Sequence, residues 1–356
     1  MQRRTFTKLM LATAATASFG GVAFAQQGLK PVRFAISSAA PTTGHAHLAS
    51  IPMAMGYFVE EGLDFTLTPF AGSGDAFNHV IAGDVIAADG GTPSAYAAIA
   101  AGQDLTMFFA SITGNVYYVA APDGSSITKL SDFVGKTIGV YSLSAAGLTL
   151  FKASMVAEGL DPNSIEYIAM PTAAEAVDQI RKGRIAAYLA FDISYAQMES
   201  LGMPTHRVDV KSQEKLGFLA GSVVKRETLE KDRDTLIKLG RSFAKGVVFA
   251  KENPEAAVRL TWKVFPNTKP LGQSEEEAMK AGLLSVKARF QNIDQVDGLY
   301  GNATTDQVQT VLDLLRTGDA LLKDLTPEQV WTGELIAEIN KFDVEAVKRQ
   351  AREWKE

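Results

Sequence analysis

The chain has 356 residues, of which 46% are hydrophobic and 21% charged, with 35 Lys and Arg against 40 Asp and Glu. This composition is typical of a globular protein and gives no sign of a disordered chain or a membrane-spanning bundle. The length favours two domains, because a single core rarely grows beyond about 250–300 residues. The chain has no Cys, which excludes disulfides, thiolate metal sites and covalently attached haem.

Residues 1–25 have the pattern of a cleavable export signal. Arg3 and Arg4 lie in a basic start, an Ala-rich apolar run follows over 9–24, and the segment ends in Ala23-Phe24-Ala25. The paired arginines are similar to a twin-arginine signal, and the Ala-x-Ala ending fits cleavage after about Ala25. The apolar run is short and interrupted by Gly, which disfavours a membrane anchor. We therefore expect an exported, periplasmic protein.

The mature chain is acidic. Removal of residues 1–25 leaves 32 basic side chains (35 less three) against 40 acidic ones, a net charge of about −8. Binding to nucleic acid depends on basic side chains that displace counterions from phosphate. A nucleic-acid partner is therefore disfavoured.

A repeated phrase marks the organisation of the chain. Glu61-Gly62-Leu63-Asp64 recurs as Glu158-Gly159-Leu160-Asp161, each time after an apolar, helix-spaced run. Gly just past a helix adopts the left-handed C-cap conformation without penalty. Both copies are preceded by a strand, a loop and a helix, and followed by a strand, a turn, a helix, a Gly and a further strand. We interpret this as two similar β/α lobes with mainly parallel sheets.

The predicted elements follow in chain order. The first lobe has predicted strands over 32–36, 65–69 and 85–89, helices over 48–59, 76–82 and 92–101, and a strand over 105–111. The second has strands over 116–121, 137–140, 165–170 and 185–192, and helices ending near 156, over 174–182 and over 193–200. A strand over 217–224 returns the chain to the first lobe. Helices over 226–248, 254–262, 274–290, 305–317 and 335–354 follow.

The two crossings predict a two-stranded hinge. Lobe 1 is assigned residues 29–115 and 215–356, which include the C-terminal helices, and lobe 2 residues 116–214. In open α/β sheets, ligands bind beyond the carboxyl ends of the strands, where helix N-termini present free N–H groups. Facing loops at those ends define a candidate cleft. The candidate ligand-binding residues are Ser37, Ser38, His45, Gly72, Ser73, Gly91, Thr92, Ser142, Ser144, Ala145, Thr172 and Asp192.

Each candidate also has a purely structural explanation. Thr92, Ser142, Ser144 and Thr172 are plausible helix N-caps, and 72–75 fits a turn followed by a cap. His45 and His47 fit solvent-exposed loop residues without a function. No Lys or Arg lies in these loops, so hydroxyls and helix N-termini are the groups offered to a polar or anionic ligand.

Asp192 divides the possible ligands. It can cap the helix over 193–200 or contact the ligand. A carboxylate in the cleft favours a ligand with N–H groups or a positive charge, whereas a sulfonate or carboxylate would be repelled unless Asp192 turns away. The aromatic residues Tyr96, Tyr141, Phe191 and Tyr195 could stack on a planar ring, although such residues are more often part of a core.

Several of these segments together resemble a known family. The residues are Gly56-Tyr57-Phe58-Val59-Glu60-Glu61-Gly62-Leu63-Asp64, Ala82-Gly83-Asp84 with Gly91, and Gly135-Lys136-Thr137-Ile138-Gly139-Val140. They are similar to the periplasmic binding proteins of ABC importers, in the group that serves nitrate, taurine, alkanesulfonates and thiamine pyrimidine precursors. The resemblance implies two lobes with a ligand between them, and closure that presents the loaded protein to a membrane permease. Fungal relatives that make the thiamine pyrimidine use a Cys-rich motif, which this chain lacks.

We therefore predict a monomeric, extracytoplasmic binding protein of an ABC importer, without a cofactor or metal. Its ligand would be a small polar or anionic molecule of the sulfonate, nitrate, aromatic acid or pyrimidine class. A ligand-sensing partner of a membrane receptor is an alternative that shares the fold. A hydrolase is less favoured: Ser142, His45 and Asp192 are the residue types of a triad, but no Gly-x-Ser-x-Gly elbow is present.

Overall fold

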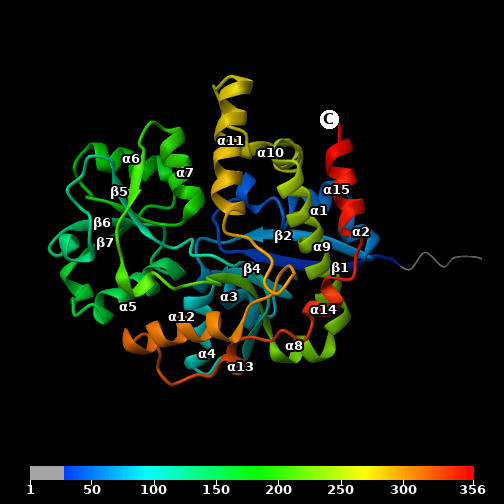
Figure 1. Cartoon of the computed structure of the whole chain (residues 1–356), viewed down its shortest axis with the longest axis horizontal. Coiled ribbons are helices and arrows are strands. Elements are labelled where there is room, and N and C mark those ends of the chain that lie inside the picture. The colour runs from blue at the N-terminus through cyan, green and yellow to red at the C-terminus, as the bar shows by residue number, and fades with distance from the viewer. Residues whose placement is uncertain (1–27) are drawn as a thin grey trace, which may run out of the picture.

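The computed structural model describes residues 28–356, and the predicted export signal lies outside them. The chain forms two α/β lobes, each built on a mixed five-stranded sheet (Figure 1). The first sheet has the order β2-β1-β3-β10-β4, with β1 at Lys30–Ile36, β2 at Leu63–Pro69, β3 at Ala87–Gly91, β4 at Leu105–Ile112 and β10 at Ala220–Lys225. The second has the order β7-β6-β8-β5-β9, with β5 at Val119–Pro122, β6 at Thr137–Val140, β7 at Glu166–Ala169, β8 at Tyr188–Leu189 and β9 at Thr205–Arg207.

The two sheets share one topology. In the first, β1 runs parallel to β2 and β3, and β10 is antiparallel to β3 and β4. In the second, β6 runs parallel to β7 and β8, and β5 is antiparallel to β8 and β9. The antiparallel strands are β10 in the first sheet and β5 in the second. Each is the first strand after the chain has crossed from the other lobe. The predicted duplication of the β/α unit is confirmed at the level of strand order.

Helices cover both sheets. Those between the strands are α1 (Ser50–Ala54), α2 (Tyr57–Glu60), α3 (Ser73–Ala82), α4 (Thr92–Ala100), α5 (Ala146–Ala157), α6 (Ala173–Arg181) and α7 (Asp192–Ser200). The C-terminal region contains α8 (Arg226–Lys231), α9 (Arg233–Glu252), α10 (Pro254–Val264), α11 (Glu275–Phe290), α12 (Thr305–Thr317), α13 (Pro327–Val330), α14 (Ile336–Ile339) and α15 (Val344–Glu353). Within residues 28–356, no helix is long and apolar enough to cross a membrane.

The repeated helix exits have the predicted conformation. Gly62 and Gly159 both have φ 76°, and their N–H groups donate to the carbonyls of Val59 and Val156 at 2.9 Å. A side chain on either residue would be strained in this left-handed region, so Gly is required there.

Three predicted helices are interrupted. The helix expected over 226–248 is broken at Asp232, between α8 and α9. The helix expected over 48–59 is broken at Gly56, which has φ 75° and separates α1 from α2. The helix expected over 335–354 stops after α14, where the Asn340 amide donates to the carbonyl of Tyr300 at 2.9 Å. A new helix, α15, begins where the Asp343 carboxylate accepts from the Ala346 N–H at 2.9 Å. The Asp343 cap and the hydrogen bond from Asn340 to Tyr300 therefore end one helix and start another, although the apolar spacing of the sequence continues through this segment.

The chain crosses between the lobes at two adjacent segments, just after β4 and just before β10. Phe218 lies on the return segment, and its N–H donates to the carbonyl of Thr113 on the outgoing segment at 2.8 Å. Phe218 is fully buried with φ 49°, a conformation that costs about 1–3 kcal/mol for a residue other than Gly. Its ring packs against Trp331 at 4.9 Å between centroids, which holds the strained backbone in place.

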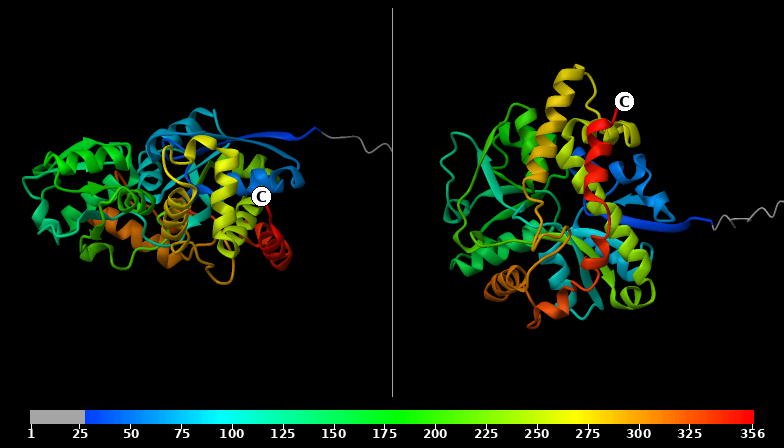
Figure 2. Two further views of the ribbon diagram at one scale, coloured as in Figure 1. Left: turned by 90° about the horizontal axis from the view of Figure 1, so that it is seen from above. Right: turned by 45° about the vertical axis from the view of Figure 1, so that its right-hand side comes forward.

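The C-terminal helices contact both lobes. Leu150 and Ala153 of α5 share one apolar core with Val311 and Leu315 of α12, while α11 packs along α7 on the other side of the molecule. Figure 2 shows the C-terminal segment, yellow to red, beside the lobe that contains β1, with the second lobe in green adjacent to it. The lobes are thus joined by an apolar contact through α5 and by a second contact through α7 and α11.

Candidate functional site

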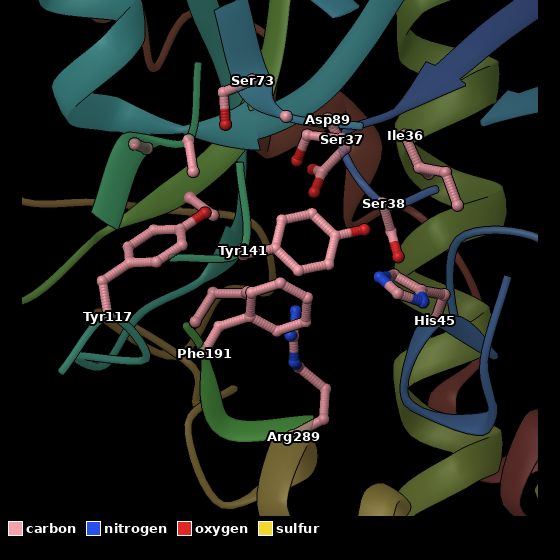
Figure 3. Close-up of a pocket in the computed structure, with 15 residues that line it drawn as sticks. Ile36, Ser37, Ser38, His45, Ser73, Asp89, Tyr117, Tyr141, Phe191 and Arg289 are labelled. Atoms are coloured by element: carbon pink, nitrogen blue, oxygen red, sulfur yellow. The ribbon is translucent and has the colours of Figure 1, made fainter. Parts of the chain in front are cut away.

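An inner cavity of about 30 Å³ lies between the lobes, where the carboxyl ends of β1 and β3 face the start of α5. Its wall carries polar groups from both lobes together with Arg289 from the end of α11 (Figure 3). The lining residues are Ile36, Ser37, Ser38, His45, Gly72, Ser73, Asp89, Ile112, Tyr117, Tyr141, Ala145, Ala146, Phe191, Ala220 and Arg289.

Six of the predicted site residues line this cavity. They are Ser37, Ser38, His45, Gly72, Ser73 and Ala145. The hydroxyl of Ser73 accepts from the Gly91 N–H at 2.9 Å, and the Ser37 N–H donates to the Asp89 carbonyl at 3.0 Å. Ser38 donates to the carbonyl of Ala40 at 2.9 Å. These bonds fix the loops after β1 and β2 around the cavity.

An outer cavity of about 400 Å³ adjoins the inner one, and Ser38, Tyr141 and Phe191 line both. The rings of Tyr141 and Phe191 meet at 67° with 4.9 Å between centroids. A volume of 400 Å³ lies within the range of small-molecule sites, whereas 30 Å³ has room for only two or three heavy atoms, since one water needs about 10–15 Å³. The two cavities therefore suit a small polar head group and a larger body.

Thr172 lines the outer cavity, but its hydroxyl is already used. It accepts from the Glu175 N–H at 3.2 Å, and the Glu175 carboxylate accepts from the Thr172 N–H at 3.2 Å. This is a complete capping box at the start of α6. The structural explanation of Thr172 is thus confirmed.

Five predicted residues line neither cavity: Gly91, Thr92, Ser142, Ser144 and Asp192. A Cβ on Gly91 would lie 2.2 Å from the Cβ of Ala146, so Gly91 serves the close approach of the two lobes. Thr92 is the first residue of α4, and its hydroxyl is fully buried without a partner, so it is not the predicted N-cap. The predicted caps Ser142 and Ser144 are also wrong, because α5 is capped by Ala145 without a side-chain bond.

Ser142 and Ser144 instead contact the opposite lobe. Their hydroxyls lie 3.0 Å apart, and the Ser144 hydroxyl donates to the carbonyl of Ala71 at 3.3 Å. The Gly74 N–H donates to the Ser144 carbonyl at 3.2 Å. Across the same gap the Ala39 N–H donates to the Tyr141 hydroxyl at 2.6 Å. The structure is therefore a closed form, with direct hydrogen bonds between the lobes.

Asp192 is neither a simple cap nor a wall of the cavities. It is the first residue of α7, and its carboxylate accepts two bonds from Arg289, from Nε at 3.0 Å and Nη2 at 2.7 Å. The two side chains are 1% and 6% exposed. Burial pushes the pKa of Asp192 upward, and the adjoining guanidinium of Arg289 opposes that shift. This bidentate pair links lobe 2 to α11.

Arg289 is the residue that the sequence reasoning missed. It lies 97 positions from Asp192 in the sequence. Basic residues are common in the last turn of a helix because they interact favourably with the helix dipole, so Arg289 did not stand out there. The sequence feature that could have indicated a partner was Asp192 itself, an acidic residue directly after a buried strand. A buried carboxylate requires a cation or several hydrogen-bond donors. Nothing local indicated which of the distant basic residues would supply it.

The two histidines are buried, which corrects the prediction of exposed loop residues. His45 Nδ1 lies 3.2 Å from the Thr42 N–H and 2.9 Å from its hydroxyl. Burial, with a further contribution from Arg289, lowers the pKa of His45 to about 3. His47 is fully buried without a hydrogen-bond partner, and its pKa is also lowered by burial. Both rings are therefore neutral at ordinary pH.

Asp89 is a buried acid in the wall of the inner cavity. Asp89 is 6% exposed, and this burial raises the pKa of its carboxyl group to about 6. Of the aromatic residues considered for stacking, Tyr141 and Phe191 line the cavities, whereas Tyr96 and Tyr195 are core residues. Among residues 28–356, no group of three His, Asp or Glu side chains is placed to hold a metal ion.

Two α/β lobes of matching topology, with a polar cavity closed between them, define the class of two-lobed periplasmic-type binding proteins. The sequence matches the NMT1/THI5-like family over residues 51–257. This match covers more than half of the 356 residues, and the chain belongs to that family. A search of curated proteins finds no match.

Solved structures of the same fold are numerous. A protein from Bordetella bronchiseptica RB50 has a TM-score of 0.70 and 20% identity, with 87% of this chain and 97% of that chain covered. The ligand-binding component of an ABC-type import system from Staphylococcus aureus, with zinc bound, has 0.63 and 14%, covering 88% and 100%. The alkanesulfonate-binding protein SsuA from Xanthomonas axonopodis pv. citri, bound to MOPS, has 0.63 and 13%, covering 85% and 98%. At these identities the likeness establishes the fold.

Proposed function

We propose that this chain is the extracytoplasmic substrate-binding component of an ABC importer, which captures a small organic molecule between its lobes. The observation that carries the proposal is the pair of adjoining cavities enclosed by both lobes, with the hydrogen bonds that close them. Its family and the import and sulfonate-binding proteins that share its fold support the same role. The partner would be a permease in the inner membrane, and the protein would act as a monomer.

The moving parts in this proposal are lobe 2, residues 116–214, and the remainder of the chain. Opening would break the bond from Ala39 to Tyr141 and the contacts of Ser144 with the Gly72 loop. Export through the signal of residues 1–25, with cleavage after about Ala25, would place the mature protein in the periplasm.

Catalysis is less well supported by the geometry. The hydrolase alternative requires Ser142, His45 and Asp192 to meet. Instead the Asp192 carboxylate binds Arg289, His45 Nδ1 bonds to Thr42, and the Ser142 hydroxyl bonds to Ser144. No relay from acid to base to hydroxyl is assembled among these three residues.

The test is ligand-induced stabilisation of the mature protein. A ligand at 100 times its dissociation constant stabilises the folded state by about 2.7 kcal/mol. The panel would contain nitrate, sulfonates, aromatic acids, pyrimidines, amines and amidines, and small-angle scattering would follow closure. Ala145→Phe, which fills the inner cavity, should abolish the response, and Ala169→Phe on the exposed edge strand β7 should retain it. If no member stabilises the protein, the proposal is wrong.

A further inference from the structure

The inner cavity contains one cation, and that cation is already paired. Arg289 is the only Lys or Arg among the described residues that line it. Its Nε and Nη2 groups bind the two oxygens of Asp192 at 3.0 and 2.7 Å, and both side chains are buried. The pair is electrically neutral, so it gives the cavity little attraction for an anion.

Within the described part of the chain, Asp89 is the acidic residue in the wall of the inner cavity that has no basic partner in an ion pair. Its carboxylate is approached by two hydroxyls: that of Ser222 donates at the long distance of 3.5 Å, and that of Ser111 also lowers its pKa, as does the more distant charge of Arg289. An ionised carboxylate can accept about four hydrogen bonds, and a buried one that lacks them is strongly disfavoured. Figure 3 shows Asp89 beside Ser37 at the wall opposite Arg289, with the Tyr141 ring between them. The cavity therefore has a buried acceptor with fewer donors than an ionised carboxylate can accept.

We propose that Asp89 determines the ligand class of this site, and that the ligand carries a cationic N–H head group, an ammonium or amidinium, rather than a sulfonate, nitrate or carboxylate. The proposal rests on the proposed binding function. A cationic head brings the sum of Asp89, Arg289, Asp192 and ligand to zero, whereas an anion raises the buried net charge to −2. The N–H groups also supply the donors that Asp89 lacks.

The outer cavity indicates where the rest of the ligand lies. Trp262, Ile193 and Leu201 contribute to its wall, and Tyr141 and Phe191 separate it from the inner cavity while lining both. An aromatic or aliphatic body can therefore occupy about 400 Å³ on the outer side of the two rings, with the head group beside them in the inner cavity. The wall also carries hydroxyl and amide groups, among them Gln197 and Asn267. A head group alone would leave this mixed, mainly apolar space unfilled.

The pH dependence of binding distinguishes the two ligand charges. Burial raises the pKa of Asp89 to about 6. Among the other groups around the cavity, His45 is neutral and Tyr117 has its pKa raised by burial, so neither changes charge between pH 5 and 8. Burial raises the pKa of Asp192 and Arg289 opposes that shift, so the pH dependence assigned to Asp89 is the part that Asp89→Asn removes. A cation binds ionised Asp89, so its affinity rises about tenfold from pH 5 to 7 and then levels off. An anion requires protonated Asp89, so its affinity falls about tenfold per pH unit above 6.

The experiment uses benzamidine and benzoate, which match in shape and differ in charge, with titration calorimetry on the mature protein between pH 5 and 8. We expect benzamidine to bind at least tenfold more tightly than benzoate at pH 7.5, and Asp89→Asn to remove at least tenfold of that affinity. Asp64→Asn, an exposed acid on β2, is the matched control and should bind like wild type. Circular dichroism establishes that the variants are folded.

Three results would overturn the inference. These are tighter binding of benzoate at pH 7.5, unchanged benzamidine binding by Asp89→Asn, and no binding of benzamidine by wild type. If an anion from the wider panel binds and closes the lobes, the inference falls while the proposed function stands. If no compound of any charge binds, both fall.

Discussion

The buried pair of Asp192 and Arg289 makes a strong prediction about closure. Asp192→Asn leaves the Arg289 guanidinium buried without a counter-charge in the closed form. Removal of one partner of a buried ion pair costs about 3–5 kcal/mol. In an open form Arg289 would regain water, so this penalty applies to closure more than to folding. We expect Asp192→Asn to favour the open form.

The size of the shift in the closure equilibrium follows from the same free-energy penalty. Since 1.36 kcal/mol corresponds to a factor of ten, a loss of 3–5 kcal/mol shifts the closure equilibrium by roughly two to four orders of magnitude. The double variant Asp192→Leu with Arg289→Met removes both charges, and well-packed apolar replacements of a buried pair are often neutral or stabilising. We therefore expect the double variant to be more closed than the single one.

Amide hydrogen exchange measures this directly. The Gly74 and Ala39 N–H groups bond across the lobes to the Ser144 carbonyl and the Tyr141 hydroxyl. Their exchange should accelerate in Asp192→Asn and recover in the double variant, while Asp209→Asn, an exposed acid on lobe 2, should match wild type. Equal exchange in wild type and Asp192→Asn, or equal acceleration in the single and double variants, would refute the reasoning.

Three further predictions concern stability. Burial raises the pKa of folded Asp89 from 3.8 to about 6. Wild type should therefore lose about 2 kcal/mol relative to Asp89→Asn as the pH rises from 4 to 7, because the folded state holds its proton over most of this range while the unfolded state has released it. Urea unfolding at both pH values checks this, and a constant difference contradicts it. Gly72→Ala should destabilise the closed form by about 1–3 kcal/mol, because Gly72 has φ 126° and a Cβ there would lie 2.4 Å from Ser144 Oγ. Adding Ser144→Gly to this variant should recover the stability lost to the clash but not the stability lost to the strained backbone. Thermal unfolding of the two variants measures both terms. Thr172→Ala should lower stability by about 1 kcal/mol through loss of the cap on α6, while an effect on ligand affinity larger than tenfold would mean that Thr172 also binds ligand.

The sequence predicted the architecture because its signals are local. The strand over 137–140 and the helix over 305–317 have the predicted bounds, and Gly62 and Gly159 end their helices in the predicted conformation. Pro at the first turn of α10 and the capping boxes of α6 and α11 are encoded within four residues. Such signals depend on short-range sterics and hydrogen bonds, which a sequence displays directly.

The site was less predictable, because its chemistry depends on distant partners. Loop position was sufficient to bring Ser37, Ser38 and Ser73 to the cavity. It did not reveal that Asp192 would be neutralised by Arg289, because their contact depends on how α11 crosses lobe 2. Nor did it reveal the burial of His47, whose backbone packs against Gly246 of α9. Electrostatics of this kind are fixed by tertiary packing.

The most direct test of the account is the distance between the lobes with and without ligand. Because the chain has no Cys, spin labels can be placed at Lys182→Cys after α6 and Lys263→Cys near the end of α10, both exposed. With the compound that raises the melting temperature most, we predict that a broad or longer distance distribution narrows to a single short distance, and that Ala145→Phe prevents this change. An identical distribution with and without a bound, stabilising compound would contradict a two-lobed protein that closes on its ligand.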